Sequence, residues 1–509
     1  MLYDLSWLEA GQVFPPPCEA ERIQRYRQNA CLFDGDHFAD SSFRHRDCFE
    51  IEAIEVYKRC ASRISQVVGN FEDVISFPTL LNYQRLMSLK MADLVCGEHP
   101  SISGSNETEN AAISLIRDSS DFDAKLYSTV IDMSRYGDAV WRIYKDYDGN
   151  NNFTCWEPTM WYPIVAQDGT CRVTMHCLCW VANLSKNKIK PDWRLYVQLH
   201  SCDKVGYYEQ REYKISDATG TIGKQVSTTM VATGLTTCGV VHLRPYTVTG
   251  TVYGYDDYVP LDSLLAEIMA RVGQISSILD KHADPCITGP ASMLERNPET
   301  GEYYLKTGKF YAVSPGEEQP SYMTWDGHLT SAFKQLELLL NQLYILSEMG
   351  AAILGGQDGS SQAISGTAMR FKMVNPLAKA RRIANALSRP VRRLFESLSE
   401  TAQDIEKVAF KNISILWSDG LPEDPRENIE NCKLATGAAQ MMPLETAIME
   451  FFNRSNAEAV KWLDKIQEER AAMEDYTDPN KPGPQDGTGV NSSKKGSETS
   501  LNNFHGLNN

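Results

Sequence analysis

The chain has 509 residues, of which 42% are hydrophobic, and its 66 acidic against 50 basic residues give a formal net charge of −16. This apolar content is enough for packed cores and excludes disorder throughout, and the length corresponds to two to four structural regions at roughly 100–200 residues each. The acidic balance excludes a protein that sheathes duplex DNA with a broad cationic surface.

The longest apolar stretches are interrupted by polar residues, as at Glu337 and Asn341, and stay below the roughly 18–20 residues of a membrane span. Residues 1–10 contain no lysine or arginine, which does not fit a signal peptide. The 13 cysteines include no C-x-x-C pair, a pattern typical of reduced thiols in a cytosolic setting. We therefore expect an intracellular protein without a membrane partner.

The first part of the chain, after an extended segment at 14–17, is predicted to be helical. A short polar helix rich in Glu and Arg is predicted over 18–31, and apolar spacing predicts helices over 50–68, 80–95 and 111–135. Gly97 and Gly137 end the last two of these helices.

The texture changes at Ala139, where apolar and polar residues begin to alternate. The alternation predicts strands over 139–144, 154–156, 172–181 and 193–200. Asp-Gly pairs at 148–149 and 168–169 are hairpin signals. The β-rich region extends to about residue 246.

Two long helices, 260–283 and 328–349, are predicted on either side of a small insert that includes strands at 303–305 and 310–313. Each helix carries a broad apolar face, and the insert offers little mass at the far end for these faces to pack against. We therefore expect the faces to be buried against further copies of the chain, in an oligomer.

The last third begins with a glycine-rich loop at 350–366. A long helix over 367–407 follows, with kinks expected at Pro376 and Pro390. The remaining predicted elements are a strand at 413–417, helices at 427–436 and 443–474, and a disordered tail at 477–509.

The glycine-rich loop is the first candidate for chemistry. A phosphate-binding P-loop needs Lys-Ser or Lys-Thr after the last glycine, whereas Gly366 is followed by Thr367 and Ala368. A mobile loop between helices is the favoured interpretation. No Gly-x-Ser-x-Gly, His-Glu-x-x-His or kinase-type set occurs, so we expect no enzyme activity.

Two groups of residues resemble metal ligands, one in an Asp-Gly-Asp motif and one in a predicted strand. The Asp-Gly-Asp motif is also common in ordinary turns. On the strand, His176 points away from Cys177 and Cys179. We therefore expect packed thiols, no metal and no cofactor. The two groups are Asp34, Asp36 and His37, and Cys171, His176, Cys177 and Cys179.

A basic segment is the most informative charge feature. Between Gly366 and Leu394 the chain has eight cations and no acidic residue. These cations either pair with acidic groups of this chain or of an adjacent subunit, or contact nucleic-acid phosphates. They are Arg370, Lys372, Lys379, Arg381, Arg382, Arg389, Arg392 and Arg393.

The order of these parts resembles the portal proteins of tailed bacteriophages, specifically the large siphovirus-type family. The resemblance covers about residues 18–475 and rests on six segments in order. They are ERIQRYRQNACLFDGDH, LLNYQRLMSLKMADLVCGE, DMSRYGDAVWRIYKDYDGN, VVHLRPY with YGYDDYVPLDSLLAEIMARVGQISSIL, SGTAMRFKMVNPLAKARR, and MMPLETAIMEFF before a Glu-rich helix.

The resemblance implies an α+β portal fold assembled as a ring, usually of twelve subunits, at one vertex of the capsid. It divides the chain into a wing, a two-helix stem, a β-containing clip and a helical crown. The implied boundaries are wing 1–259, stem helix 260–284, clip 285–327, stem helix 328–349, tunnel loop 350–366, kinked wing helix and strand 367–424, crown 425–476 and tail 477–509.

It further implies a channel through which double-stranded DNA is packaged and ejected. The tunnel loop would touch this DNA through Gln357, Asp358, Ser360, Ser361 and Gln362. The clip would dock the terminase and then the head–tail connector through Tyr303, Tyr304, Lys306, Lys309, Phe310 and Tyr311. The other implied partners are the major capsid protein and a scaffold, and the implied location is the virion, after assembly in the host cytoplasm.

Two alternatives remain. Another oligomeric virion protein or adaptor without a DNA channel would form rings only on a partner. An enzyme would present a deep polar pocket with perturbed titratable groups.

Overall fold

The computed structural model describes most of the chain, in two compact units, Met1–Arg426 and Glu427–Asn509. The predicted helix at 50–68, the strand at 310–313 and the tail beyond Thr477 lie outside the described residues. Those described are 1–35, 81–147, 149–185, 191–283, 287–288, 294–296, 298, 303–305, 316, 321–322, 329–355, 371–399, 410, 412–418, 425–437, 441–452, 454 and 456–477.

Four helices open the described part of the first unit, after the 3-10 turns η1 (Ser6–Leu8) and η2 (Pro17–Glu19). The single helix predicted over 111–135 is wrong, because the chain breaks at Asp121, whose φ of 55° is incompatible with a continuous helix. Gly137, at φ 78°, ends the last helix as predicted. The helices are α1 (Ala20–Asp34), α4 (Tyr83–Cys96), α5 (Glu107–Ser120) and α6 (Phe122–Tyr136).

The β-rich region forms two antiparallel sheets, with strand orders β4-β5-β6-β7-β8 and β3-β2-β9. All four predicted strands are present, and helices and strands are segregated along the chain, so the expected α+β class is confirmed. The strands are β2 (Ala139–Lys145), β3 (Asn151–Trp156), β4 (Trp161–Val165), β5 (Val173–Asn183), β6 (Trp193–Ser201), β7 (Tyr207–Ile215), β8 (Ile222–Ala232) and β9 (Val240–Leu243), with η3 (Pro158–Met160) before β4.

The five-stranded sheet is covered on both faces. One face packs on the N-terminal segment, including Trp7 and Phe14. The other contributes Leu178 to a cluster with Val140 and Val240 of the three-stranded sheet. The N-terminal segment is therefore part of the sheet's core.

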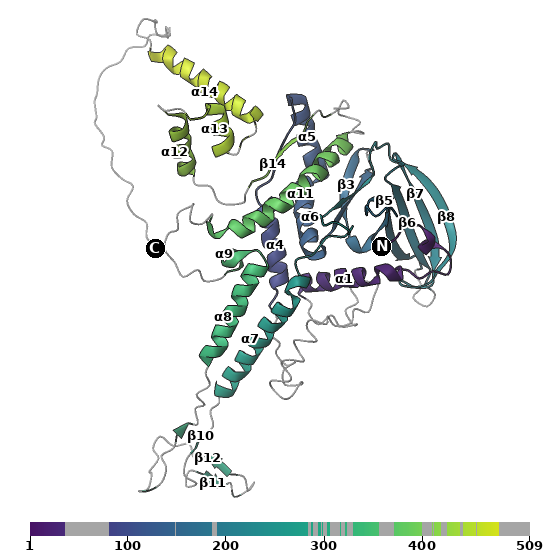
Figure 1. Cartoon of the computed structure of the whole chain (residues 1–509), viewed down its shortest axis with the longest axis vertical. Helices are drawn as coiled ribbons and strands as arrows, with labels where there is room; N and C mark the ends of the chain where they lie inside the picture. The colour runs from purple at the N-terminus through teal and green to yellow at the C-terminus, as the bar shows by residue number, and fades with distance from the viewer. Residues whose placement is uncertain are drawn as a thin grey trace, which may run out of the picture. The chain divides into compact units, whose positions relative to one another are not determined.

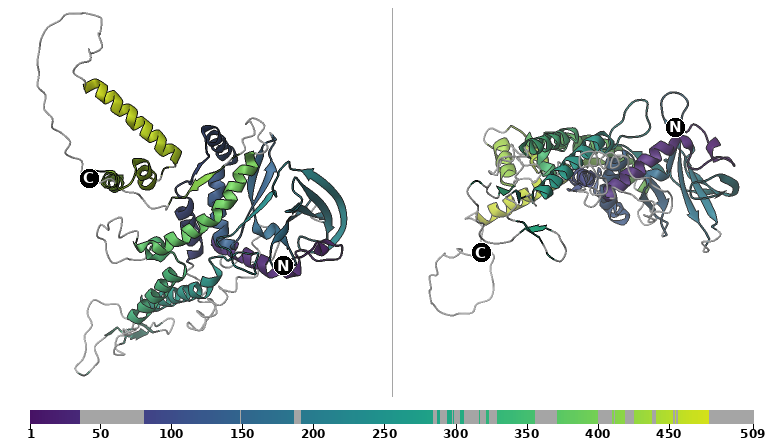
Figure 2. Two further views of the ribbon diagram at one scale, coloured as in Figure 1. Left: turned by 45° about the horizontal axis from the view of Figure 1, so that its top comes forward. Right: turned by 90° about the horizontal axis from the view of Figure 1, so that it is seen from below.

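Two helices, α7 (Asp262–Ala283, after η4, Val259–Leu261) and α8 (Leu329–Leu346), lie side by side and extend from the rest of the first unit (Figures 1 and 2). This confirms the two predicted long helices. Four short strands follow α7 and form two hairpin-like pairs, namely β10 (Ile287–Thr288) with β13 (Ser321–Tyr322), and β11 (Leu294–Arg296) with β12 (Tyr303–Leu305). The predicted strand at 303–305 is therefore present.

The segment after α8 differs from the predicted loop at its start, because residues Gly350–Leu354 form a short helix, α9. Gly355, at φ 82°, ends it. The long basic helix is α11 (Val374–Ser399). Pro376 does not interrupt this helix because it lies in the first turn, where no intrahelical N–H partner is required. The helix also continues through Pro390.

The strand predicted at 413–417 is β14 (Ser414–Leu416), which pairs with β1 (Ser101–Ser103) more than 300 residues earlier. The last described helices are α12 (Pro425–Thr436), whose first two residues belong to the first unit, and α13 (Leu444–Phe451) and α14 (Asn456–Thr477) of the second unit. The single helix predicted over 443–474 is therefore wrong: α13 ends at Phe451, and α14 begins five residues later. In the described residues, no helix combines the length and the apolar character needed to cross a membrane.

Candidate functional site

Helix α11 is the element on which the sequence-predicted basic residues come together. Its apolar side is buried against α4, α5, β3 and β9. Phe395, for example, meets the ring of Phe122 edge-on with the centroids 5.0 Å apart. The buried apolar residues are Pro376, Ala380, Ile383, Ala384, Leu387, Val391, Leu394, Phe395 and Leu398. Their spacing of three or four residues fixes which side of α11 faces outward.

The outward side of α11 is cationic. Arg381, Arg389, Arg392 and Arg393 are exposed, and none of them has a hydrogen bond or ion pair to another described residue. At 100° per residue they lie within about a third of the helix circumference, and Arg381 and Arg393 are about 18 Å apart along the axis. We name these four side chains the arginine stripe. A stripe of this kind suits a line of phosphates or of carboxylates from another molecule.

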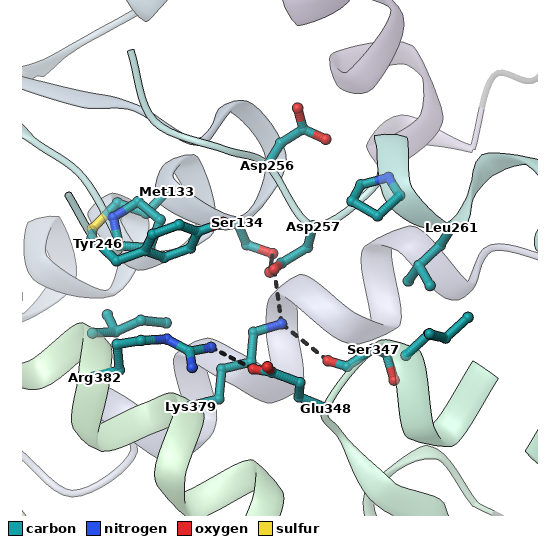
Figure 3. A pocket seen from close by; sticks show the side chains of 14 residues that line it. Met133, Ser134, Tyr246, Asp256, Asp257, Leu261, Ser347, Glu348, Lys379 and Arg382 are labelled. Atoms are coloured by element: carbon teal, nitrogen blue, oxygen red, sulfur yellow. Dashed lines mark hydrogen bonds and ion pairs between the residues drawn. The ribbon is translucent and has the colours of Figure 1, made fainter. Parts of the chain in front are cut away.

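Lys379 belongs to a different side of the same helix. It is buried, and its Nζ lies 2.8 Å from Oδ1 of Asp257 and donates a hydrogen bond of 3.1 Å to the carbonyl of Ser347 (Figure 3). Asp257 precedes α7, and Ser347 directly follows α8. The lysine therefore ties α11 to the roots of both long helices.

A series of hydroxyl groups continues this junction into the helical core. Ser134 Oγ donates to Oδ2 of Asp257 at 2.7 Å. Since a hydroxyl has one proton, Ser88 Oγ must donate to Ser134 Oγ at 2.9 Å, and the Tyr258 hydroxyl to Ser88 Oγ at 2.6 Å. Burial raises the pKa of Tyr258, so this phenol stays a donor. The hydrogen bonds thus all run toward Asp257, which joins α4 and α6 to α11.

Arg382 lies at the rim of the junction. It forms an ion pair with Glu348 (Figure 3), and its guanidinium lies over the ring of Tyr246, 5.6 Å from the centroid. Glu348 occupies the turn between α8 and α9 with φ 59°. The space enclosed between these groups is about 140 Å³. Pockets for small ligands measure roughly 300–1,000 Å³. The junction is therefore too small for such a ligand, and we interpret it as a structural contact between helices.

The remaining predicted residues are distributed as follows. Lys372 is exposed before α11, and Arg370 lies outside the described residues. Tyr303 and Tyr304 are in β12, opposite Arg296 and Glu295. The other predicted clip and tunnel-loop residues also lie outside the described part of the chain: Lys306, Lys309, Phe310, Tyr311, Gln357, Asp358, Ser360, Ser361 and Gln362.

Sequence reasoning missed the acceptors of the junction, Asp257, Ser347 and Glu348. They are far from α11 in the chain, so no local pattern indicates them. One signal was available for Lys379, which falls on the apolar side of the helical wheel, next to Pro376 and Ile383. A cation in that position must find a buried partner.

Of the two groups of candidate metal ligands, the group of cysteines and His176 does not assemble, and the other lies mostly outside the described residues. Asp34 is the last residue of α1, whereas Asp36 and His37 lie outside the described residues. Cys177 and Cys179 are buried on one face of β5, where burial raises the pKa of both thiols. His176 lies on the opposite face and accepts a hydrogen bond from Trp161.

The α7–α8 pair forms a second candidate surface. Large apolar side chains of α8 are exposed: Leu338 at 59%, Ile345 at 62% and Leu346 at 58%. Leu338 and Ile345 lie on one side of the helix, away from Leu336 and Leu340, which pack toward the core, whereas Leu346 lies near Leu339 on the helical wheel and lines the junction. This side of α8 also carries exposed polar residues such as Lys334 and Asn341, and within the described residues the chain does not cover its two apolar side chains.

Comparison with known proteins places this geometry in context. Residues 79–221 and 324–472, more than half of the chain, match the family described as "Phage portal protein, SPP1 Gp6-like". No curated protein matches the chain. Among solved structures, a chain from the "Virion of native gene transfer agent (GTA) particle" is similar at 12% identity and a TM-score of 0.40, over 87% of this chain and 96% of that one.

Proposed function

The chain belongs to the SPP1 Gp6-like family of phage portal proteins, and from this premise we propose that it forms a ring through which double-stranded DNA enters and leaves the capsid. As a portal protein it is a structural component of a virion and not an enzyme. The ring of twelve subunits, the channel and the docking partners are our proposal.

The exposed apolar side of α8 is the observation that carries the ring. Leu338 and Ile345 protrude from a pair of helices that has no further layer of the described chain on that side. Burying such residues contributes about 1.5–3 kcal/mol for each side chain. Repetition of this contact around a closed ring leaves no copy uncovered.

The subdomains follow the same premise. We assign the wing to 1–259 and 367–424, the stem to α7 and α8, and the clip to 285–327. The tunnel loop would be 350–366, of which α9 forms the root, and the crown would be 425–476. The division between compact units at Arg426 supports the start of the crown.

The arginine stripe would serve either the contact between neighbouring subunits or a contact with DNA. A net charge of −16 on each chain favours a local role, because a ring of acidic subunits repels phosphate overall. DNA that slides must also not be gripped by a continuous cationic wall. The clip would dock the terminase first and the head–tail connector afterwards, and the capsid protein and a scaffold would surround the wing.

Negative-stain electron microscopy of the purified chain, together with mass photometry, tests the ring. We expect closed rings with a hole that admits a duplex, of roughly 20 Å or more. Rings that appear only on addition of another virion protein would support the alternative, an adaptor without a channel of its own.

Deletion of residues 355–362 tests the tunnel loop. We expect rings of normal size that package or retain DNA poorly. Loss of rings in this deletion variant would reassign the segment to packing between subunits. The control is a deletion within the tail, residues 490–497, which should leave both properties unchanged.

A further inference from the structure

His176, Cys202 and Cys238 come together at the edge between the two sheets of the first unit. The ligand-type atoms of the three side chains all lie within 4.8 Å of one another. The sequence did not indicate this cluster, because Cys202 and Cys238 are 36 positions apart and the intervening segment contains the β7–β8 hairpin. The cluster has two candidate roles, a metal site and a pair of oxidisable thiols.

Backbone pairing places one cysteine at the end of a strand in each sheet. His176 of β5 faces His200 of β6 across the sheet, so Cys202, two residues further, shares the face of His200. The Cys202 N–H donates to the carbonyl of Thr174 at 2.9 Å, which extends the pairing past the end of β6. Cys238 directly precedes Gly239 and β9, in the other sheet. A link between the thiols would therefore join the two sheets.

The hydrogen bonds of His176 argue against a metal. Its Nδ1 accepts from Trp161 Nε1 at 3.0 Å, so the proton of the neutral imidazole is on Nε2. That N–H interacts with the sulfur of Cys202. A metal ion on Nε2 would need a lone pair there and a proton on Nδ1, which would then oppose the indole N–H. The ring as oriented is a donor to sulfur and not a ligand.

Two hydrogen bonds to its sulfur prepare Cys238 as a nucleophile. Its sulfur receives hydrogen bonds from the Cys202 thiol and from the backbone N–H of Val240, and these lower the pKa of Cys238. Both cysteine side chains are only partly buried. Thiolate character combined with access is what makes a cysteine reactive.

We propose that Cys202 and Cys238 form an oxidisable pair that closes a disulfide between the five-stranded and the three-stranded sheet. The oxidant is a peroxide. The Cys238 thiolate attacks one peroxide oxygen, the O–O bond breaks, and the leaving hydroxide takes a proton to become water. The Cys202 sulfur then attacks the resulting sulfenic acid, the S–O bond breaks, and a second water leaves. Two thiols lose two electrons, and one peroxide is reduced to two waters.

The disulfide would act as a staple for the wing. It closes the segment that contains the β7–β8 hairpin, and such closure stabilises chiefly by restricting the unfolded chain. The side chains must rotate so that the sulfurs approach to about 2.05 Å. We expect the midpoint of thermal unfolding to rise by on the order of 5 °C in the oxidised protein.

Peptide mapping of the full-length chain tests the proposal. The reduced protein is treated with hydrogen peroxide and digested without reductant, and mass spectrometry searches for a Cys202–Cys238 cross-linked peptide. We expect this cross-link in the wild type and in Cys18→Ser, which removes an exposed thiol elsewhere. Cys202→Ser should leave Cys238 as a sulfenic acid that dimedone traps, and Cys238→Ser should show neither product.

Two results would overturn the proposal. In the first, Cys202 and Cys238 remain reduced under conditions that oxidise Cys18. In the second, elemental analysis finds one zinc ion bound to each chain in the wild type and in Cys18→Ser but none in Cys202→Ser, and the cluster is then a metal site. Both results are independent of ring formation and of DNA passage.

Discussion

The first unit without α7 and α8, which we call the body, differs from the α7–α8 pair in how its large side chains are buried. In the body, the fully buried Trp141 and Trp161 each donate their indole N–H, at 2.7 Å to Thr129 and at 3.0 Å to His176. On α8, in contrast, Leu338 and Ile345 are more than half exposed. These two tryptophans satisfy their polar groups within the chain, whereas the two α8 side chains have no cover from the described chain.

Buried charge shows the same contrast. Asp138 is fully buried and accepts from the backbone N–H of Gly254 at 2.9 Å and from the Tyr26 hydroxyl, and it pairs with His242 at 2.6 Å. These hydrogen bonds hold the pKa of Asp138 below its usual value, although burial alone would raise it. Helix α11 carries both kinds of cation: Lys379 is paired inside the body, whereas the arginine stripe faces outward.

The largest effect on stability is expected from replacing the buried Lys379. Lys379→Met leaves Asp257 without its cation next to the roots of α7 and α8, which should lower the free energy of unfolding by roughly 3 kcal/mol. Urea unfolding of the monomer measures this. Arg389→Met is the matched control, since it makes the same change on the exposed side of the same helix, and it should change stability by less than about 0.5 kcal/mol. Equal losses in the two variants would refute the contrast.

The second effect concerns assembly. Leu338→Glu with Ile345→Glu places charges on the exposed side of α8, so we expect loss of rings with little change in monomer stability. Mass photometry counts the subunits. Leu115→Glu with Met230→Glu is the control, because these two residues are similarly exposed on the body, at 52% and 56%, and rings should persist. Rings in the α8 variant would show that this surface is not an interface.

The third prediction separates the two roles of the arginine stripe. Replacing Arg389, Arg392 and Arg393 by Gln should leave folding intact. If the stripe contacts phosphates, the slope of log K against log salt for duplex binding becomes shallower by about 0.9 for each lost contact. If it contacts a neighbouring subunit, ring assembly weakens and the slope is unchanged. Replacing the exposed Lys204, Lys214 and Lys224 by Gln is the control, which should alter neither property.

The smallest effect is expected at the rim of the junction. Arg382 and Glu348 are both more than 40% exposed, so solvent screens their attraction and Arg382→Ala should cost about 0.5 kcal/mol or less. A double-mutant cycle with Glu348→Gln measures the coupling. A coupling of several kcal/mol would mean that the rim belongs to the buried junction.

Local pattern predicted much of the fold. The helices α4, α7, α8 and α11, the four strands near their predicted places and the strand β14 all follow from the spacing of apolar residues, because that spacing is a property of one segment. At one of the failed predictions, a single residue decided the outcome. Asp121 adopts a left-handed conformation and divides α5 from α6, and its neighbours Ser120 and Phe122 are weaker helix formers than alanine or leucine.

Predictions for the candidate site were less complete. The cationic character of α11 was evident in the chain, yet only the fold separates Lys379 and Arg382, which have partners in the junction, from the outward arginine stripe. The residues expected to touch DNA at 357–362, and Lys306 to Tyr311 of the clip, stay predictions.

The order of elements, the apolar sides of the helices and the family of the chain follow from the sequence, because each is evident in runs of neighbouring residues. Only the folded chain shows that Asp257 meets Lys379, that β1 pairs with β14 and that Cys202 lies beside Cys238. Such contacts join residues tens to hundreds of positions apart. They arise when apolar sides are buried together and the polar groups carried along must find partners.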